Sequence, residues 1–284
     1  MKYTSLFAAA YLAAFSFQPM PTFAQDADDP VSQCLAIAQA EPKIILAALD
    51  ANPLEIKGDV TITYSGHSTF RIETPDGVVA ATDFSGLYGT QPTLPRIVTM
   101  NRAHSSHHTL NPDPAIEFVL AGWNDVGTGP IDHDLVVDDI YVRNVATDIR
   151  TFGDGMIADG NSIFVFETAG LCIGHLGHLH HPLTDDHFAQ IGRLDIVMVP
   201  VDGGLTLSHQ AMADITTRLR SSIVLPMHLR GNSISSFINR MGSDWKTEYL
   251  KGNAITVNVG SLPKQPTIFV PKSLGSGGGF SDFE

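Results

Sequence analysis

The chain has 284 residues, of which 43% are hydrophobic, enough to bury the core of one large domain or two small ones. Its formal net charge is −13 and no basic stripe offsets it, so its surface repels nucleic-acid phosphates and anionic membranes. This excludes the usual nucleic-acid-binding proteins. An anionic partner would need a locally positive site, which a bound metal cation would supply.

The first 24 residues have the features of a secretory signal peptide. Lys2 supplies a positive charge, Leu6–Phe17 is an apolar run without charge, and Thr22-Phe23-Ala24 offers a small-residue cleavage site. The apolar run is too short for a membrane-spanning helix, and no second run of spanning length follows. The alternative is an uncleaved N-terminal anchor. We therefore expect an exported protein, periplasmic or secreted, without stable insertion into a membrane.

The rest of the chain divides into a helical segment, a large domain and a tail. Residues 25–57 contain two predicted short helices, Val31–Ala40 and Lys43–Ala51. Residues 58–271 carry the predicted strands and form the main domain. Residues 272–284 are rich in glycine and serine and are predicted to be disordered.

In the main domain, hairpin strands come first and buried strands linked by helices follow. Pro75-Asp76-Gly77 predicts a hairpin turn between two short strands. The nearly all-apolar runs Asp195–Val201 and Ser222–Met227 are typical of strands buried on both faces, and Ser208–Arg220 between them is typical of a helix. The other predicted strands are Val60–Tyr64, Thr69–Glu73, Val78–Ala81, Ile97–Met100, Ile140–Val145, Ile163–Glu167, Leu171–Gly174, Ala254–Val257 and Thr267–Val270. This order indicates two sheets packed face to face and covered by helices.

The two cysteines, Cys34 and Cys172, match none of the paired-cysteine zinc motifs. In an oxidising compartment they could form one disulfide. The alternative is that both are small buried apolar residues, with Cys172 inside a strand. The sequence leaves both readings open.

Three groups of histidines each follow a predicted strand directly: Arg102–His108, His175–His181 and His228. Side chains that follow strands in this way can converge at one end of a sheet. Neutral imidazole is the commonest ligand of zinc, and it also suits copper, iron and nickel. A single histidine after a strand is more often a hydrogen-bonded loop residue, but three groups together predict a metal site.

These segments resemble motifs of the metallo-β-lactamase superfamily, in its branch of lactonase-like and phospholipase-like metal-dependent hydrolases. The matching segments are Tyr64–Phe70 for the Gly-His-Ser/Ala signature, Ala81-Thr82-Asp83 for the strand-end Asp, Arg102–His107 for His-x-His-x-Asp-His, Gly174–His178 for His-Leu-Gly-Asp, and Pro200–Gly204 with Pro226-Met227-His228. The resemblance runs from about Val60 to Val270. It implies an α/β (α+β) fold, the four-layer αββα sandwich, with a metal site along one sheet edge.

The chain departs from the family's motifs at four positions. Arg102 stands where the first His is expected, and Ser106 stands where the motif has Asp. His178 takes the position of the Asp that usually bridges two metals. The stretch Val145–Asp148 lacks the remaining His ligand.

Carried over residue by residue, the family pattern leaves His107, His178 and His228 as three imidazole ligands with an open position for water. His104 is either a fourth ligand or a group that contacts one. His175 is the next candidate, through an alternative register of its loop. We therefore predict one ion rather than two, with Zn²⁺ as the expected metal, although histidines alone do not identify it.

Other residues are assigned to the surroundings of the metal. Asp83 is predicted to accept a hydrogen bond from a ligand imidazole, and the alternative is that it is an ordinary turn residue. His67 is predicted to line the pocket, and the alternative is that it forms a hydrogen bond within its loop. His108 and His180 could shuttle protons, because imidazole titrates near neutral pH, or could lie in a solvated loop. Arg102 would hold an anionic group of a small-molecule substrate, or else pair with a nearby aspartate.

Two functions follow from these assignments. The first is an exported metal-dependent hydrolase in which a metal-bound hydroxide attacks an ester, lactone or phosphoester-type substrate. The second is a non-catalytic or degenerate metal-binding protein of the same fold, which the four departures favour. At position 178 a histidine stands in place of the family's aspartate, so one metal-ligating residue type replaces another. A site that had merely lost its function would more often carry an inert residue there, and this favours the enzyme. Oxidative chemistry with copper or iron is a third reading, weakened by the missing carboxylates.

Overall fold

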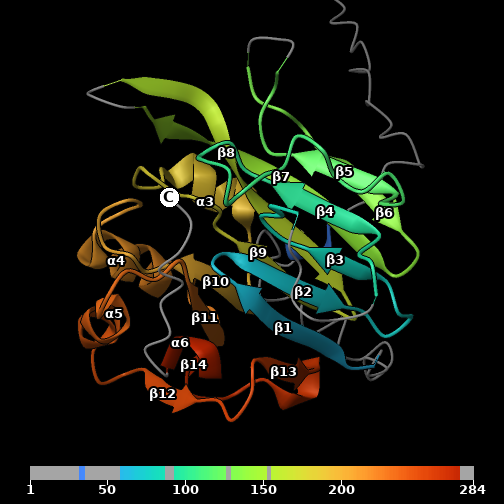
Figure 1. Ribbon diagram of the computed structural model, residues 1–284. Coiled ribbons are helices and arrows are strands. Elements are labelled where there is room, and N and C mark those ends of the chain that lie inside the picture. Colours follow the sequence, from blue (N-terminus) through green and yellow to red (C-terminus); the bar gives the residue numbers. More distant parts are fainter. Residues whose placement is uncertain (1–31, 36–57, 87–92, 126–128, 152–154, 276–284) are drawn as a thin grey trace, which may run out of the picture.

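The computed structural model describes residues 32–35, 58–86, 93–125, 129–151 and 155–275 (Figure 1). The predicted signal peptide, most of the predicted segment 25–57 and the tail beyond residue 275 lie outside these ranges. Of the two helices predicted in 25–57, the described residues include only part of the first, where Gln33, Cys34 and Leu35 are helical. Within the described part, no helix is both long enough and apolar enough to cross a membrane.

The first sheet contains six strands in the order β13-β1-β2-β3-β4-β5. They are β1 (Val60–Gly66), β2 (Thr69–Glu73), β3 (Val79–Ala81), β4 (Ile97–Met100), β5 (Phe118–Ala121) and β13 (Ala254–Val257). Strands β1 to β3 are antiparallel, as the hairpin signals predict. Gly77, with φ of +85°, closes the turn into β3 by donating its N–H to the carbonyl of Thr74.

The second sheet contains eight strands in the order β12-β14-β11-β10-β9-β8-β7-β6. They are β6 (Asp134–Val137), β7 (Ile140–Arg150), β8 (Met156–Thr168), β9 (Leu171–His175), β10 (Ile196–Pro200), β11 (Ile223–Met227), β12 (Lys246–Tyr249) and β14 (Thr267–Val270). Strands β6 to β9 form an antiparallel meander, and β9, β10, β11, β14 and β12 run parallel to one another in that order. Every residue of β10 and β11 is buried, as their apolar runs predict.

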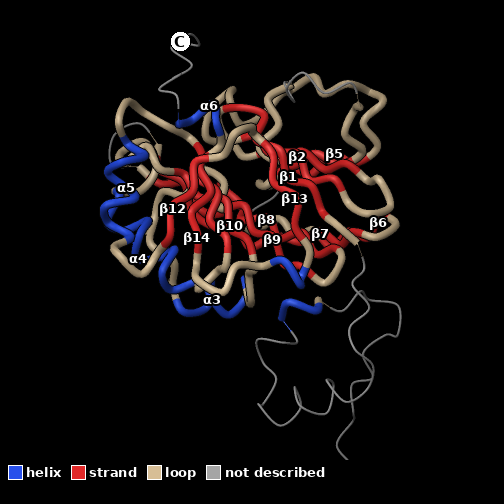
Figure 2. Tube along the Cα trace, turned by 90° about the horizontal axis from the view of Figure 1, so that it is seen from below, coloured by secondary structure: helices blue, strands red, loops and turns tan. Residues whose placement is uncertain are grey.

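Helices flank the second sheet on its outer side. They are α3 (Asp185–Ile191), α4 (His209–Leu219) and α5 (Ser233–Met241), with the short α6 (Lys272–Gly275) and the 3₁₀ turn η1 (Val259–Ser261) near the end of the described chain. In Figure 2, α3, α4 and α5 lie on the side of the eight-stranded sheet that faces away from β1 and β2. Two mixed sheets with flanking helices confirm the predicted α/β sandwich.

The hydrophobic core fills the space between the two sheets. Large side chains on the inner faces, such as Phe70 and Ile72 of β2 and Phe164 and Phe166 of β8, are at most 1% exposed. Removing one such phenylalanine would cost about 3–5 kcal/mol, because the transfer free energy is lost and a cavity remains. The packed core makes a rigid frame, and the loops at the strand ends stand on it.

Two stretches for which the sequence predicts no strand, Asn111–Val126 and Arg150–Asn161, contain strand residues in the structure. The first contains β5, and the second contains the start of β8, which pairs with the end of β7 in a long hairpin. The outer part of this hairpin extends beyond the sandwich and buries few residues, so it shows little hydrophobic alternation (Figure 1). The first residues of the predicted tail form α6, in which Leu274 is buried.

The N-terminal residues that are described are tied to the second sheet. Cys34 and Cys172 form a disulfide, which decides between the two readings of the sequence. Beside it, the buried Glu167 accepts hydrogen bonds from the Ser32 hydroxyl (2.5 Å) and the backbone N–H of Gln33 (2.9 Å). Arg143 balances the charge of Glu167 at 3.0 Å. This anchor lies at the start of β9.

Candidate metal centre

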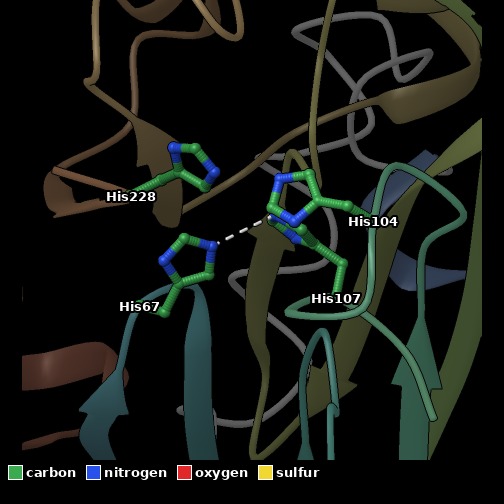
Figure 3. Close-up of side chains that lie close together, drawn as sticks. All are labelled: His67, His104, His107 and His228. Carbon is green, nitrogen blue, oxygen red and sulfur yellow. Dashed lines mark hydrogen bonds between the residues drawn. The ribbon is translucent and has the colours of Figure 1, made fainter. Parts of the chain in front are cut away.

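Four histidine side chains converge where connections from both sheets meet (Figure 3). They are His67, His104, His107 and His228, and each offers one ring nitrogen within 4.8 Å of the other three. We call these residues the histidine cluster. His67 stands in the turn between β1 and β2, His104 and His107 lie in the loop after β4, and His228 directly follows β11.

The backbone holds these positions in an uncommon conformation. His67 and His228 have φ of 50° and 53°, in the left-handed region that residues other than glycine rarely adopt. The N–H of His228 donates to the carbonyl of His67 at 2.9 Å, which joins the turn of one sheet to a strand end of the other. The hydroxyl of Tyr64 donates to the same carbonyl at 3.0 Å. Such strain persists only where surrounding contacts fix it, and it is often found at functional sites.

A buried carboxylate orients His107. Nδ1–H of His107 donates to Oδ2 of Asp83 at 2.6 Å, and Nδ2 of Asn101 donates to Oδ1 of Asp83 at 2.7 Å. The Asn101 amide is itself fixed, because its Oδ1 accepts the backbone N–H of Ser162 at 2.7 Å. Burial raises the pKa of Asp83, and the electrostatic interaction with His175 and the hydrogen bond from Asn101 oppose that rise. With its proton on Nδ1, His107 keeps an electron pair on Nε2.

A second aspartate, Asp202, lies beside His228, with Oδ2 at 3.1 Å from Nδ1 of the ring. Its Oδ1 accepts the backbone N–H groups of Gly204, Leu205 and Thr206. Burial raises the pKa of Asp202, but the adjacent His228 imidazole and the hydrogen bond from the Thr206 hydroxyl outweigh burial and hold the pKa below its usual value. Both ring nitrogens of His228 are buried and have no well-aligned hydrogen-bond partner among the described residues, so Asp202 contacts the ring by charge and proximity.

Ser106 lies between the two remaining rings of the cluster. Its hydroxyl is 2.9 Å from Nε2 of His67 and 2.6 Å from Nδ1 of His104. A hydroxyl can serve both rings as a hydrogen-bond partner, but it carries no charge. The cluster is therefore a set of imidazoles without a carboxylate ligand.

The donor set fits a metal ion. Burial lowers the pKa of His67 to about 4, and it lowers the pKa values of His104 and His107 as well, so these rings are neutral at pH 7 as ligation requires. Nε2 of His67 and Nε2 of His107 lie 3.3 Å apart. Two nitrogens bound at about 2.0–2.1 Å to a tetrahedral zinc ion would be separated by about 3.3 Å. The unpaired Nε2 of His228 supports the same conclusion.

Two predicted ligands take other positions. The His178 ring lies beside the cluster, with centroids 4.7 Å from His107 and 4.8 Å from His228, but it does not belong to the group of four. Both nitrogens of His175 are engaged: Nε2 donates to the carbonyl of Ser68 at 2.8 Å, and Nδ1 accepts the N–H of Gly177 at 3.1 Å. The structure therefore leaves His175 without a free nitrogen for a metal.

The three residues predicted to act on substrate are spread around the cluster. Both nitrogens of His180 are engaged, one with His178 and one with the backbone of Arg150, and burial lowers its pKa to about 4. A group so held does not suit proton transfer near pH 7. His108 packs edge-on against Trp123, with ring centroids 5.6 Å apart. Arg102 is exposed, and the structure gives it no ion pair among the described residues.

Three residues of this centre have contacts that the sequence does not predict. The sequence predicts that His67 lines the pocket, and its ring is one of the four that converge; it predicts no role for Asn101 or Asp202. A signal existed for Asp202, since it lies in the Pro200–Gly204 segment directly after β10. The role of Asn101 depends on Ser162, 61 residues away, and only the fold brings the two together.

Comparisons with known proteins agree with this architecture. A family model described as a beta-lactamase superfamily domain matches residues 61–228, more than half of the chain. A candidate Zn-dependent hydrolase of the metallo-β-lactamase superfamily from Thermotoga maritima has a similar structure, with a TM-score of 0.54, 23% identity, and coverage of 74% of this chain and 98% of that one. A candidate metal-dependent hydrolase from Parabacteroides distasonis has a TM-score of 0.52 and 14% identity, covering 75% and 93%. No curated protein matches the chain.

Proposed function

The chain belongs to the metallo-β-lactamase superfamily, and we propose on this basis that it is a hydrolase whose single metal ion is held by the histidine cluster. The observation that carries the proposal is the convergence of four imidazoles, each with a ring nitrogen within 4.8 Å of the others. The proposed ligand set differs from the one expected from the sequence at two positions: His67 joins it and His178 stands outside it. His104 takes the place of the fourth ligand that the sequence already offered.

The chemistry of the donors favours a borderline-soft transition metal over magnesium or calcium, which prefer oxygen ligands. We propose zinc. Bound zinc supplies a positive charge that makes water more acidic and neutralises charge that develops on a substrate oxygen.

The protein's own residues prepare the site for that ion. Asp83 accepts the Nδ1 proton of His107, and the carboxylate of Asp202 lies 3.1 Å from Nδ1 of His228, so the Nε2 electron pairs remain available. The Ser106 hydroxyl contacts Nδ1 of His104 and so leaves Nε2 of that ring available, whereas its contact with His67 is at Nε2 and would give way to the metal. These contacts reduce the reorganisation that metal binding requires.

We propose a small ester, lactone or phosphoester as substrate. Arg102 is exposed in the loop that carries His104 and His107, and its fixed positive charge supports a role in holding an anionic group. On an otherwise acidic protein, such a local positive charge would favour the anionic end of a substrate over the surrounding surface.

Elemental analysis of protein purified without added metal, followed by turnover assays on an ester, lactone and phosphodiester panel, tests this function. We expect about one equivalent of zinc, with metal and activity both lost in His107→Ala. His133→Ala is a matched control, since His133 is hydrogen-bonded to the carbonyl of Ala121 outside the cluster. Arg102→Ala should weaken the binding of anionic substrates without removing metal.

One observation favours a second candidate, a metal-binding protein without hydrolytic activity. Ser106 occupies the place of the carboxylate that the family's motif carries, so the cluster has no anionic ligand that could also accept a proton. Fully zinc-loaded protein that turns over no member of the panel, and binds anions equally well with and without Arg102, would decide for this candidate.

We further propose that the protein is exported. Lys2, the apolar run Leu6–Phe17 and the cleavage site at Thr22-Phe23-Ala24 support a signal peptide. The disulfide between Cys34 and Cys172 supports an oxidising compartment. Mass spectrometry of protein made with its own N-terminus in a secreting bacterial host should find a chain that begins at Gln25. An uncut chain in the cytoplasmic fraction would contradict the proposal.

A further inference from the structure

A chain of hydrogen bonds ends at the histidine cluster. The backbone N–H of Arg150, the last residue of β7, donates to Nδ1 of His180 at 2.7 Å. Nε2 of His180 lies 2.7 Å from Nδ1 of His178. The guanidinium of Arg150 donates to the carbonyls of Leu205 and Thr206, each at 2.7 Å, which fixes the end of the hairpin.

The direction of this chain follows from its first member. A backbone N–H can only donate, so Nδ1 of His180 must carry an electron pair and the proton of that neutral ring must sit on Nε2. Nε2–H of His180 then donates to Nδ1 of His178. The opposite direction would leave His180 with no proton at all, an imidazolate that does not exist free at neutral pH. The proton of His178 is therefore on Nε2.

His178 thus differs from the ligands beside it. In His107 a carboxylate accepts the Nδ1 proton and leaves an electron pair on Nε2, whereas in His178 an N–H donor occupies Nδ1 and leaves a proton on Nε2. The His178 side chain is 3% exposed, and its Nε2 has no partner among the described residues. Its ring centroid is within 5.1 Å of those of His104, His107 and His228.

We propose that His178 is a fixed hydrogen-bond donor at the centre, which binds an anionic oxygen of substrate or product and does not ligate the metal. An N–H cannot donate an electron pair to a cation. A buried N–H without a partner is costly, and an anionic oxygen of a carboxylate, phosphate or tetrahedral adduct would satisfy it. His180 is a positioning residue, since it acts on the site only through His178. The proposal deepens the proposed hydrolase function and rests on it.

Nuclear magnetic resonance on the unmodified protein tests the direction of the chain. With ¹⁵N-labelled histidine, long-range ¹H–¹⁵N correlation separates protonated from unprotonated ring nitrogens, and His178→Gln assigns the relevant ring. We expect Nε2 of His178 to stay protonated when zinc is added, while cluster rings such as His107 show a metal-bound nitrogen. A metal-bound Nε2 on His178 would overturn the proposal. Rings of the cluster that do not respond to zinc would instead count against the proposed metal site.

Variants at position 178 test what the donor binds, with inorganic phosphate as the probe on zinc-loaded protein. His178→Phe should keep the full zinc content and weaken phosphate binding about tenfold, the loss expected for one hydrogen bond to a charged group. His178→Gln, whose side-chain amide can accept from His180 and still donate, should recover most of that loss. His181→Phe in the same loop is the control and should change neither quantity.

Two results of the variant series would overturn the donor role of His178. Loss of zinc from folded His178→Gln would make His178 a ligand and overturn the donor role. Unchanged phosphate affinity in both His178 variants would overturn it as well. Because the Phe variant could misfold at a buried position, the Gln variant and the spectra of the unmodified protein keep the test independent of it.

Discussion

Replacing Asp83 by Asn changes one buried oxygen to an NH₂ group and little else. Asp83 is fully buried with φ of 43°, and Asn is among the few residues that tolerate this backbone region. The substitution keeps the shape of the side chain, so its effect reports on the hydrogen bonds that the carboxylate receives.

Both oxygens of Asp83 accept hydrogen bonds, from Asn101 and from His107. Asn101 cannot turn its amide around, because its own oxygen accepts the N–H of Ser162. The new NH₂ group must therefore face either the Asn101 amide or Nδ1 of His107. In the first case two buried donors face each other. In the second case His107 must move its proton to Nε2 and loses the electron pair that would bind metal.

The first outcome costs the metal-free protein about 1–3 kcal/mol of unfolding free energy, the penalty of one unsatisfied buried donor. The second lowers zinc affinity about 10–100-fold, or about 1.4–2.8 kcal/mol, as expected for loss of a group that orients a ligand histidine. In either case Asp83→Asn loses free energy, as unfolding free energy of the metal-free protein in the first case and as zinc-binding free energy in the second.

Urea unfolding of the metal-free protein measures the first quantity, and competition with a chromophoric chelator measures zinc affinity. Asp139→Asn is the matched control, because Asp139 also accepts on both oxygens, from Thr74 at 2.6 Å and from the N–H of Asp76 at 3.0 Å, but it lies outside the cluster. The control should keep its zinc affinity. Asp83→Asn with unchanged stability and unchanged zinc affinity would refute the orienting role.

Three further predictions concern the ligands, the disulfide and the loop. His67→Ala should leave the metal-free melting temperature nearly unchanged but abolish most of the rise that zinc produces in the wild type; a full zinc-induced rise would exclude His67 as a ligand. Replacing Cys34 and Cys172 together by serine should lower the unfolding free energy by up to about 5 kcal/mol, since the disulfide spans 138 residues of sequence; a loss below about 1 kcal/mol in urea titration would contradict this. Gly177→Ala should lower the unfolding free energy by about 2–5 kcal/mol. The φ of Gly177 is +59°, and a Cβ there would lie 2.5 Å from Nδ2 of Asn101, which donates to Asp83. Gly252→Ala, with no atom within 4 Å of its Cβ position, is the control, and equal melting temperatures for the two variants would refute the clash.

Several elements could be predicted from sequence because their signals are local. The limits of β2, β4, β13 and β14 agree with the prediction residue by residue, since each is a short run of suitable residues bounded by turn or loop residues. Family membership, which the ordered motifs indicate, is confirmed by the match over residues 61–228.

Other elements have weak local signals. Strand β5 exposes part of both faces, β12 is largely polar, and α3 and α5 are helices of 7 and 9 residues, so their apolar patterns are short. Their formation depends on pairing with a neighbouring strand or packing against a sheet. Patterns of this length do not separate such elements from loops.

The sequence alone placed histidines at the ends of three strands and so determined that imidazoles would gather in this protein. Only the tertiary structure decided which of them face one another and which ring nitrogen each can offer. His175 is turned away by a carbonyl 107 residues earlier in the chain, His107 is held by an aspartate 24 residues before it, and His178 is controlled through His180 by the backbone of Arg150. Residue type and strand order are local properties that a sequence displays. The proton position on an imidazole depends on its hydrogen-bond partner, and folding brings that partner from a distant part of the chain.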